Sequence, residues 1–235
     1  MTAATQAGAP LWVSIEGING VGKTSAARAT AAALGTRGVL LDELTDQAND
    51  TLPGKVIAAL SGNGDLFLRT GHPVVETLAL LALQVRKSER LAGRDLTGVD
   101  VIIEDRGMDS VAVYQAAILC AEHPRQPAQE LARRILSDAH RWCGLPDATV
   151  LLTGDPAVCT QRFANRIGRR IAPADVALIE EIDRLYRAIA VDNPERFVLL
   201  DVADLSPQET AEALGRTVNA LMDRQATPVM KGKAA

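Results

Sequence analysis

The stretch "LWVSIEGINGVGKTS" (residues 11–25) decides the fold of this chain. It begins with a short apolar run typical of a buried strand, and an Ala-rich helical segment follows from Lys23. Between them, four residues separate Gly17 from Gly22-Lys23-Thr24. This spacing is typical of a loop whose backbone N–H groups surround a phosphate, with the lysine on the β- and γ-phosphates and the threonine hydroxyl on Mg²⁺. The residues expected to bind ATP phosphates are Gly17, Asn19, Gly20, Val21, Gly22, Lys23, Thr24 and Ser25.

Four more apolar runs alternate with longer helical segments along the chain. The runs lie at 38–43, 99–105, 148–153 and 196–201, and the helical segments include 23–35, 74–91, 108–121, 127–142, 173–190 and 207–223. Strands that alternate with helices indicate βαβ units, which build a parallel sheet covered on both faces. We therefore expect a three-layer α/β P-loop NTPase fold with a five-stranded parallel sheet and helices on both faces. Ligands of such sheets bind beyond the carboxyl ends of the strands.

The composition is that of a globular protein that works on small molecules. The 235 residues are 47% hydrophobic with a net charge of −4, which does not favour a nucleic acid polymer or an anionic membrane as partner. The three cysteines are widely spaced and are interpreted as reduced thiols. No apolar stretch reaches the roughly 18 residues that span a bilayer, so we expect a soluble, cytoplasmic protein. One domain over 1–235 is expected, with a flexible leader (1–10) and a flexible tail (224–235).

A second informative stretch is "VIIEDRGMDSVAVYQ" (residues 101–115). Its apolar start predicts a buried strand that brings Asp105 and Arg106 to the carboxyl edge of the sheet. Asp105 could then hold Mg²⁺ together with Thr24, and Arg106 could clamp a phosphoryl group through two parallel hydrogen bonds. The alternative is a structural Asp–Arg ion pair at a strand end.

In these motifs the chain resembles the thymidylate kinase family of nucleoside monophosphate kinases. That family carries Asp-Arg, an aromatic, two residues, Ser and then Ala-Tyr-Gln. The positions that match in register are Asp105, Arg106, Asp109, Ser110, Tyr114 and Gln115. "EGINGVGKT" and "PDATVLLTGDPAVCTQR" (residues 146–162) resemble the family's phosphate loop and fourth strand. The resemblance covers residues 11 to 220 and implies an ATP- and Mg²⁺-dependent kinase, a nucleotide acceptor such as dTMP, and a homodimer.

Four arginines gather in "QRFANRIGRRIAPAD" (residues 161–175). They are Arg162, Arg166, Arg169 and Arg170. The first, second and fourth are spaced by four and share one helical face. Guanidiniums this close repel one another unless an anion is bound, although a solvated basic face is the ordinary alternative. The family resemblance implies a lid, here at 162–173, that closes over ATP and places a catalytic arginine on the transferring phosphate. Arg166 and Arg169 are the first candidates for that role.

The chain departs from the family's pattern where the acceptor should bind. The family holds the acceptor phosphate with an arginine after the second strand, but "LLDELTDQANDTLPGK" (residues 40–55) has no cation before its final lysine. The family also has Asp-Arg on the next long helix, where this chain has "LLALQVRKSER" (residues 80–90). Arg86 or Arg90 could substitute there, although neither is in register.

Two single replacements fall in the same region. Asn19 stands where the family's phosphate loop has Asp, and Gly107 stands where it has an aromatic, which we expect to open space on the acceptor side. Glu43 could act as a base on a free hydroxyl, as related deoxynucleoside kinases imply, or could simply face solvent. The residues expected to bind the acceptor are Glu43, Arg86, Arg106, Ser110, Tyr114 and Gln115. By resemblance, the residues near adenine are Asp201, Val202 and Ala203.

These observations lead to one hypothesis and two alternatives. The hypothesis is an ATP-dependent kinase in which Lys23 and a lid arginine neutralise the moving γ-phosphoryl group while Thr24 and Asp105 hold Mg²⁺. Its first acceptor is a nucleoside monophosphate such as dTMP. A nucleoside 5′-hydroxyl or another small metabolite is the second possibility. A nucleotide-binding regulator without turnover is the third, and the intact Lys23, Thr24 and Asp105 argue against it.

Overall fold

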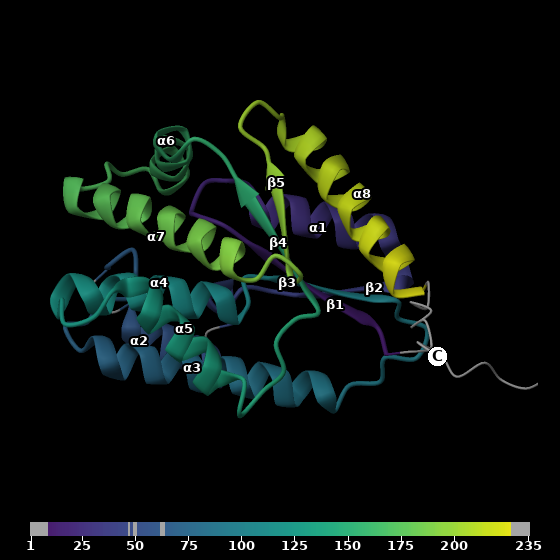
Figure 1. Ribbon diagram of the computed structural model, residues 1–235, viewed down its shortest axis with the longest axis horizontal. Helices are drawn as coiled ribbons and strands as arrows, with labels where there is room; N and C mark the ends of the chain where they lie inside the picture. Colours follow the sequence, from purple (N-terminus) through teal and green to yellow (C-terminus); the bar gives the residue numbers. More distant parts are fainter. Residues whose placement is uncertain (1–8, 47, 49–50, 62–63, 227–235) are drawn as a thin grey trace, which may run out of the picture.

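The computed structural model describes residues 9–46, 48, 51–61 and 64–226, which form an α/β fold around one sheet (Figure 1). The strands are β1 (Leu11–Glu16), β2 (Gly38–Leu41), β3 (Val101–Asp105), β4 (Ala148–Thr153) and β5 (Phe197–Asp201). They lie in the order β2-β3-β1-β4-β5 and every pairing is parallel. The predicted five-stranded parallel sheet is therefore confirmed.

The apolar runs form strands here because helices cover both faces of the sheet. Val13 of β1, Ile103 of β3 and Val150 of β4 are all fully buried in the central core. Alternation of polar and apolar residues is not needed in a strand that meets no solvent on either side. Since β1 lies between β3 and β4, the loops after these three strands meet at one edge of the sheet.

Helices cover the sheet in two layers. They are α1 (Lys23–Leu34), α2 (Leu52–Leu60), α3 (Pro73–Ala92), α4 (Met108–Glu122), α5 (Ala128–Ala139), α6 (Pro156–Ile167), α7 (Pro173–Asp192) and α8 (Pro207–Ala226). Helices α1 and α8 pack together on one face, while α3, α4 and α5 lie on the other (Figure 1). The predicted three-layer arrangement with helices on both faces is confirmed.

The region expected to be a lid is partly helical. Helix α6 begins at Pro156, where the Asp155 carboxylate accepts hydrogen bonds from the next two backbone N–H groups. It ends at Gly168, which adopts a left-handed conformation with φ 65° and ψ 23°. The non-helical part of the expected lid is therefore limited to residues 168–172, before α7 begins at Pro173.

The expected leader and tail lie mostly outside the described residues. Residues 224–226 belong to α8, so the part of the expected tail that the structure describes is helical. Among the described residues, no helix has the length and apolar character needed to cross a membrane. Cys120, Cys143 and Cys159 are all free thiols.

Candidate active site

The phosphate loop joins β1 to α1 and is fixed by contacts with β4 and α6. Gly17 and Gly20 have φ values of 138° and 83°. A Cβ at Gly20 would lie 2.0 Å from the Cys159 carbonyl oxygen, and one at Gly17 would lie 2.5 Å from that of Leu152. Both glycines are required because no side chain fits between the loop and its neighbours.

Lys23 lies under this loop and is almost completely buried. Its ammonium donates a 2.8 Å hydrogen bond to the Ile18 carbonyl oxygen. Burial, and then the positive charge of Arg106, lower the pKa of Lys23 to about 7. A polyphosphate in the loop would add the negative charge that keeps this lysine protonated. The position of the Lys23 ammonium therefore suits a cation that pairs with a phosphate bound in the loop.

Thr24 and Asp105, the two residues expected to hold Mg²⁺, lie together at the start of α1 and the end of β3. The two side chains are hydrogen-bonded to each other. The Asp105 carboxylate is buried, its Oδ1 atom has no hydrogen-bond partner among the described residues, and burial raises its pKa. A hydroxyl beside a carboxylate with an unused oxygen is the oxygen donor set that Mg²⁺ prefers. The residues present therefore fit the ion that the sequence predicted.

Arg106 is held in a strained position that directs its guanidinium towards the phosphate loop. Its φ of 59° lies in the left-handed region, which non-glycine residues rarely adopt. It donates to the Asn19 amide oxygen and to Ser110 Oγ, the latter at 3.3 Å, and lies 5.0 Å from the centroid of the Tyr114 ring. Strain of this kind persists only where surrounding contacts enforce it, and it is common at functional sites.

Glu43 pairs with this guanidinium. Its Oε1 atom lies 3.1 Å from Arg106 Nε, although Nε makes no hydrogen bond of good geometry with any described residue. Burial alone would raise the pKa of Glu43, but the charges of Arg106 and Lys23 outweigh it and lower the pKa. A carboxylate with a lowered pKa is a poor general base. The geometry therefore favours Glu43 as the partner of Arg106 over Glu43 as a base.

A cavity of about 610 Å³ extends from this site. Five of the six residues expected to bind the acceptor line it, namely Glu43, Arg106, Ser110, Tyr114 and Gln115. Arg86 instead lines a separate groove with Arg90, between α3 and β2, so the structure does not bring it to the acceptor cavity. Helix α3 instead contributes Gln84 to the lining of the acceptor cavity. The sequence also did not identify the apolar lining residues Phe67, Leu80 and Phe163.

The carboxylate of Glu16 connects the elements behind Arg106. This fully buried side chain accepts hydrogen bonds from Gly107 N–H at 2.7 Å, Ser110 Oγ at 2.5 Å and Tyr186 OH at 2.9 Å. Burial and a neighbouring carboxylate raise its pKa. Glu16 thus joins the end of β1 to the start of α4 and to α7. Ser14, two residues away, also donates to this carboxylate, but the three partners that define its role lie 91 to 170 residues away, so its own part of the sequence did not indicate the role.

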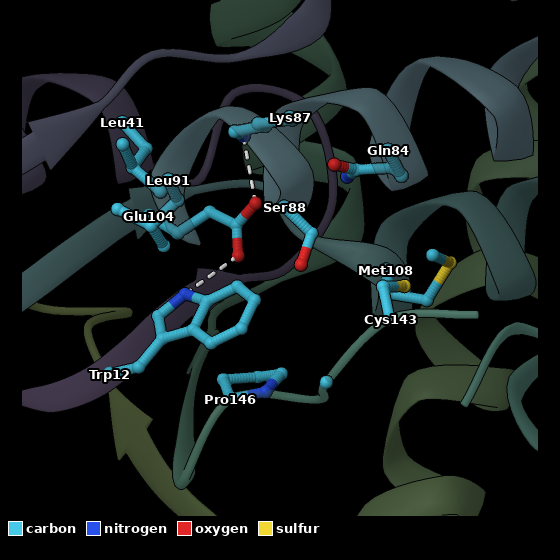
Figure 2. Close-up of a pocket in the computed structure, with 11 residues that line it drawn as sticks. Trp12, Leu41, Gln84, Lys87, Ser88, Leu91, Glu104, Met108, Cys143 and Pro146 are labelled. Carbon is cyan, nitrogen blue, oxygen red and sulfur yellow. Dashed lines mark hydrogen bonds and ion pairs between the residues drawn. The ribbon is translucent and has the colours of Figure 1, made fainter. Parts of the chain in front are cut away.

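A second group of contacts, between the side chains of Trp12, Glu104 and Lys87, lies beside the end of β3 (Figure 2). Glu104 accepts a 3.0 Å hydrogen bond from Trp12 Nε1 and forms a 2.8 Å ion pair with Lys87, which also donates to the Arg106 carbonyl oxygen. The enclosed space is only about 10 Å³, room for about one water. Gly107 also lines the acceptor cavity, and a Cβ at this position would lie 2.8 Å from both Glu104 Oε2 and Ser14 Oγ. The space that this glycine is expected to open on the acceptor side stays a prediction.

The four lid arginines have different positions. Arg166 lines the acceptor cavity, and its guanidinium lies 5.3 Å from the centroid of the Phe163 ring. Arg169 donates a 3.1 Å hydrogen bond to the Gly64 carbonyl oxygen. Arg162 and Arg170 are exposed and do not line the cavity. Of the two expected catalytic arginines, Arg166 is the one that faces the site.

The residues expected near adenine are Asp201, which ends β5, and Val202 and Ala203, which follow it. Val202 is buried and its N–H donates to the Thr153 carbonyl oxygen at 2.8 Å, while the Ala203 N–H donates to the Asp201 carboxylate at 3.1 Å. None of the three lines the acceptor cavity. They lie at the same carboxyl edge of the sheet as the phosphate loop, where β4 and β5 end.

Comparison with known proteins gives one consistent result. The thymidylate kinase family model matches residues 15–213. A probable thymidylate kinase from Methanocorpusculum labreanum is 27% identical over 212 residues, covering 89% of this chain and 98% of that protein. Another from Halobacterium salinarum is 28% identical over 211 residues, covering 90% and 97%. A thymidylate kinase from Bifidobacterium longum subsp. infantis is 27% identical over 216 residues, covering 90% and 87%.

Proposed function

The chain belongs to the thymidylate kinase family, and on this basis we propose that it transfers the γ-phosphoryl group of ATP to the phosphate of dTMP. The observation that carries the proposal is the cavity of about 610 Å³ that begins at Thr24 and Arg106 and extends beside α3 and α4. It places an acceptor directly next to the loop that would hold the γ-phosphate. Its volume is in the range of small-molecule sites.

The proposed reaction relies on positioning and charge. The phosphate loop would bind the ATP phosphates through backbone N–H groups, and Lys23 and Arg166 would neutralise the γ-phosphoryl group as it moves. Thr24 and Asp105 would hold Mg²⁺, which supplies charge neutralisation between the β- and γ-phosphate oxygens when it is bound. Arg106 would hold the acceptor phosphate in line with the γ-phosphate.

The charges around the cavity favour a phosphorylated acceptor over a nucleoside. Three arginines line it, Arg28, Arg106 and Arg166, against the two carboxylates of Glu43 and Asp65. A nucleoside acceptor would instead need a base for its hydroxyl, and Glu43 is a weak base because its pKa is lowered. These features support dTMP as the first acceptor and leave nucleosides as the alternative.

An ADP-release assay over several acceptors tests the proposal. We expect turnover with dTMP and ATP, and at least about a thousandfold lower kcat/KM with thymidine, because a site built around a polar group rejects an analogue that lacks it. Turnover with thymidine and none with dTMP would show that the acceptor is a nucleoside and not a nucleoside monophosphate. Tight ATP binding without turnover of any nucleoside or nucleoside monophosphate would point to a regulator.

We further propose that the chain acts as a homodimer. Apolar side chains lie exposed on the first turns of α3, with Val74 at 57%, Val75 at 62% and Leu78 at 59% exposure. Apolar side chains grouped on one surface commonly mark a protein interface. Light scattering should give twice the mass of the 24.9 kDa chain, and the mass of a single chain would contradict the proposal. The three free thiols also favour the reducing cytoplasm as the compartment, which cell fractionation would test.

A further inference from the structure

Residues 64–69, here called the acceptor loop, form a preorganised wall of the cavity. The Asp65 carboxylate accepts hydrogen bonds from the backbone N–H groups of Phe67 at 2.8 Å and Arg69 at 3.1 Å. The same carboxylate pairs with the Arg69 guanidinium, at 3.0 Å to Nε and 2.7 Å to the terminal nitrogen. Leu68 is held at a φ of 61°, a strained value for a leucine. The loop is therefore shaped around the Arg69 side chain.

This loop faces the lid helix across the acceptor cavity. Phe67 and Leu68 line one side of the cavity, and Phe163, Arg166 and Ile167 of α6 also line it. An acceptor of nucleotide size would contact the loop at the same time as it approaches Arg166. The position of the loop relative to α6 and α7 then decides how Arg166 meets the acceptor.

Two contacts join the acceptor loop to the lid region. The Arg69 guanidinium donates a 2.6 Å hydrogen bond to the Asp175 carboxylate, in the first turn of α7. Arg169, inside the 168–172 segment, donates to the carbonyl oxygen of Gly64 at 3.1 Å. The loop is thus attached both within the lid segment and just beyond it. The side chains of Arg69 and Asp175 are only 28% and 11% exposed, so the pair is partly shielded from solvent screening.

The Asp175 contact is not needed to satisfy Arg69. Asp65 already neutralises the guanidinium with three hydrogen bonds inside the loop. The additional bond spans 106 residues of sequence and connects the acceptor loop to the first turn of α7. The Arg69–Asp175 bond adds little to the stability of the loop itself, but it fixes the loop to α7. A movement of the loop can therefore move the start of α7, and the reverse.

We propose that Arg69 and Asp175 are positioning residues that couple acceptor binding to placement of the lid. An acceptor that contacts Phe67 and Leu68 holds the loop in place, and the Arg69–Asp175 bond then fixes the start of α7 and the 168–172 segment. Arg166 is thereby held towards the γ-phosphate. The reverse follows by linkage, so ATP binding strengthens acceptor binding by the same factor. This inference rests on the proposed function.

The test measures directly the factor by which a bound ATP analogue strengthens the binding of dTMP. Dissociation constants of dTMP are determined with and without a non-hydrolysable ATP analogue and Mg²⁺, in the wild type and in Asp175→Asn. The asparagine keeps the shape of the side chain and removes its charge. We expect a wild-type factor of at least about fivefold, within the usual range for coupled sites, and a factor close to one in Asp175→Asn. Each ligand alone should bind the variant within about threefold of wild type, and Asp175→Glu should restore part of the coupling.

Asp183→Asn is the matched control. It lies on the same helix and removes an i,i+4 pair with Arg187, at 2.7 Å, that is remote from the acceptor loop. Its coupling factor should equal that of the wild type. Unchanged coupling in Asp175→Asn, a wild-type factor near one, or equal losses of both single-ligand affinities would overturn the coupling role. No dTMP binding to the wild type would instead contradict the proposed function and, with it, this inference.

Discussion

Replacing Lys23 with methionine is expected to lower kcat for phosphoryl transfer by at least about a thousandfold. The wild-type ammonium is buried under the phosphate loop, where its hydrogen bond to the Ile18 carbonyl oxygen leaves its charge for the β- and γ-phosphates in the proposed reaction. Methionine keeps the apolar stem and removes the charge. The ADP-release assay with saturating ATP and dTMP measures the loss.

The pH dependence of ATP binding gives this prediction a second readout. In the empty site the Lys23 pKa is about 7, and bound phosphates raise it, so ATP binding takes up a proton above that pH. Wild-type affinity for ATP should therefore weaken as pH rises from 7 to 9, and that trend should be absent in Lys23→Met. Lys55→Met, on the exposed side of α2, is the control and should leave both quantities unchanged. A kcat for Lys23→Met within tenfold of wild type would remove Lys23 from the mechanism.

Arg166→Met is the second substitution with a large expected effect, a loss of about a thousandfold in kcat with little change in ATP affinity. The phosphate loop contains no arginine, so an arginine that assists Lys23 in stabilising the transferring phosphoryl group must come from another segment. Arg166 is the lid arginine that lines the acceptor cavity, and its position above the Phe163 ring fixes the direction of its side chain. Single-turnover measurements separate its effect on chemistry from effects on binding.

The other lid arginines provide matched comparisons. Arg170→Met removes the same charge from an exposed position and should change kcat by less than about threefold, as expected for surface charges that meet no ligand. Arg169→Met should have an intermediate effect, because this side chain binds the acceptor loop and does not face the cavity. A thousandfold loss in Arg169→Met together with near-normal turnover in Arg166→Met would transfer the catalytic role to Arg169.

The parts of the molecule that the sequence predicted correctly are those whose determinants are local. The β1 strand, the glycine-rich turn and α1 follow one another directly, and burial on both faces leaves the central strands β1, β3 and β4 as plain apolar runs. Helix α2 was not foreseen and the start of α6 was not located, although each helix carries a local start signal. Thr51 and Asp155 cap α2 and α6, and both helices have a proline in the first turn.

The parts that could not be predicted depend on contacts between distant segments. Arg86 was a reasonable candidate for the acceptor site because of its charge, but the packing of α3 turns Gln84 into the cavity and Arg86 into the groove beside β2. The strained φ of Arg106 is likewise enforced from outside its own segment, by Glu16 through Ser110 and by Lys87 through the backbone carbonyl. The Asp105-Arg106 motif itself therefore gives no indication that Glu16 and Lys87 support Arg106.

The contacts of Trp12 beside the end of β3 also give this chain an optical probe. The chain has two tryptophans, and Trp142 is 59% exposed, whereas the indole of Trp12 is hydrogen-bonded to Glu104. A water-soluble quencher should therefore suppress the emission of the exposed Trp142 more strongly than that of the partly buried Trp12. The remaining fluorescence would come from an indole joined through Glu104 and Lys87 to the Arg106 backbone, so changes at the end of β3 can be followed by light without attaching a dye.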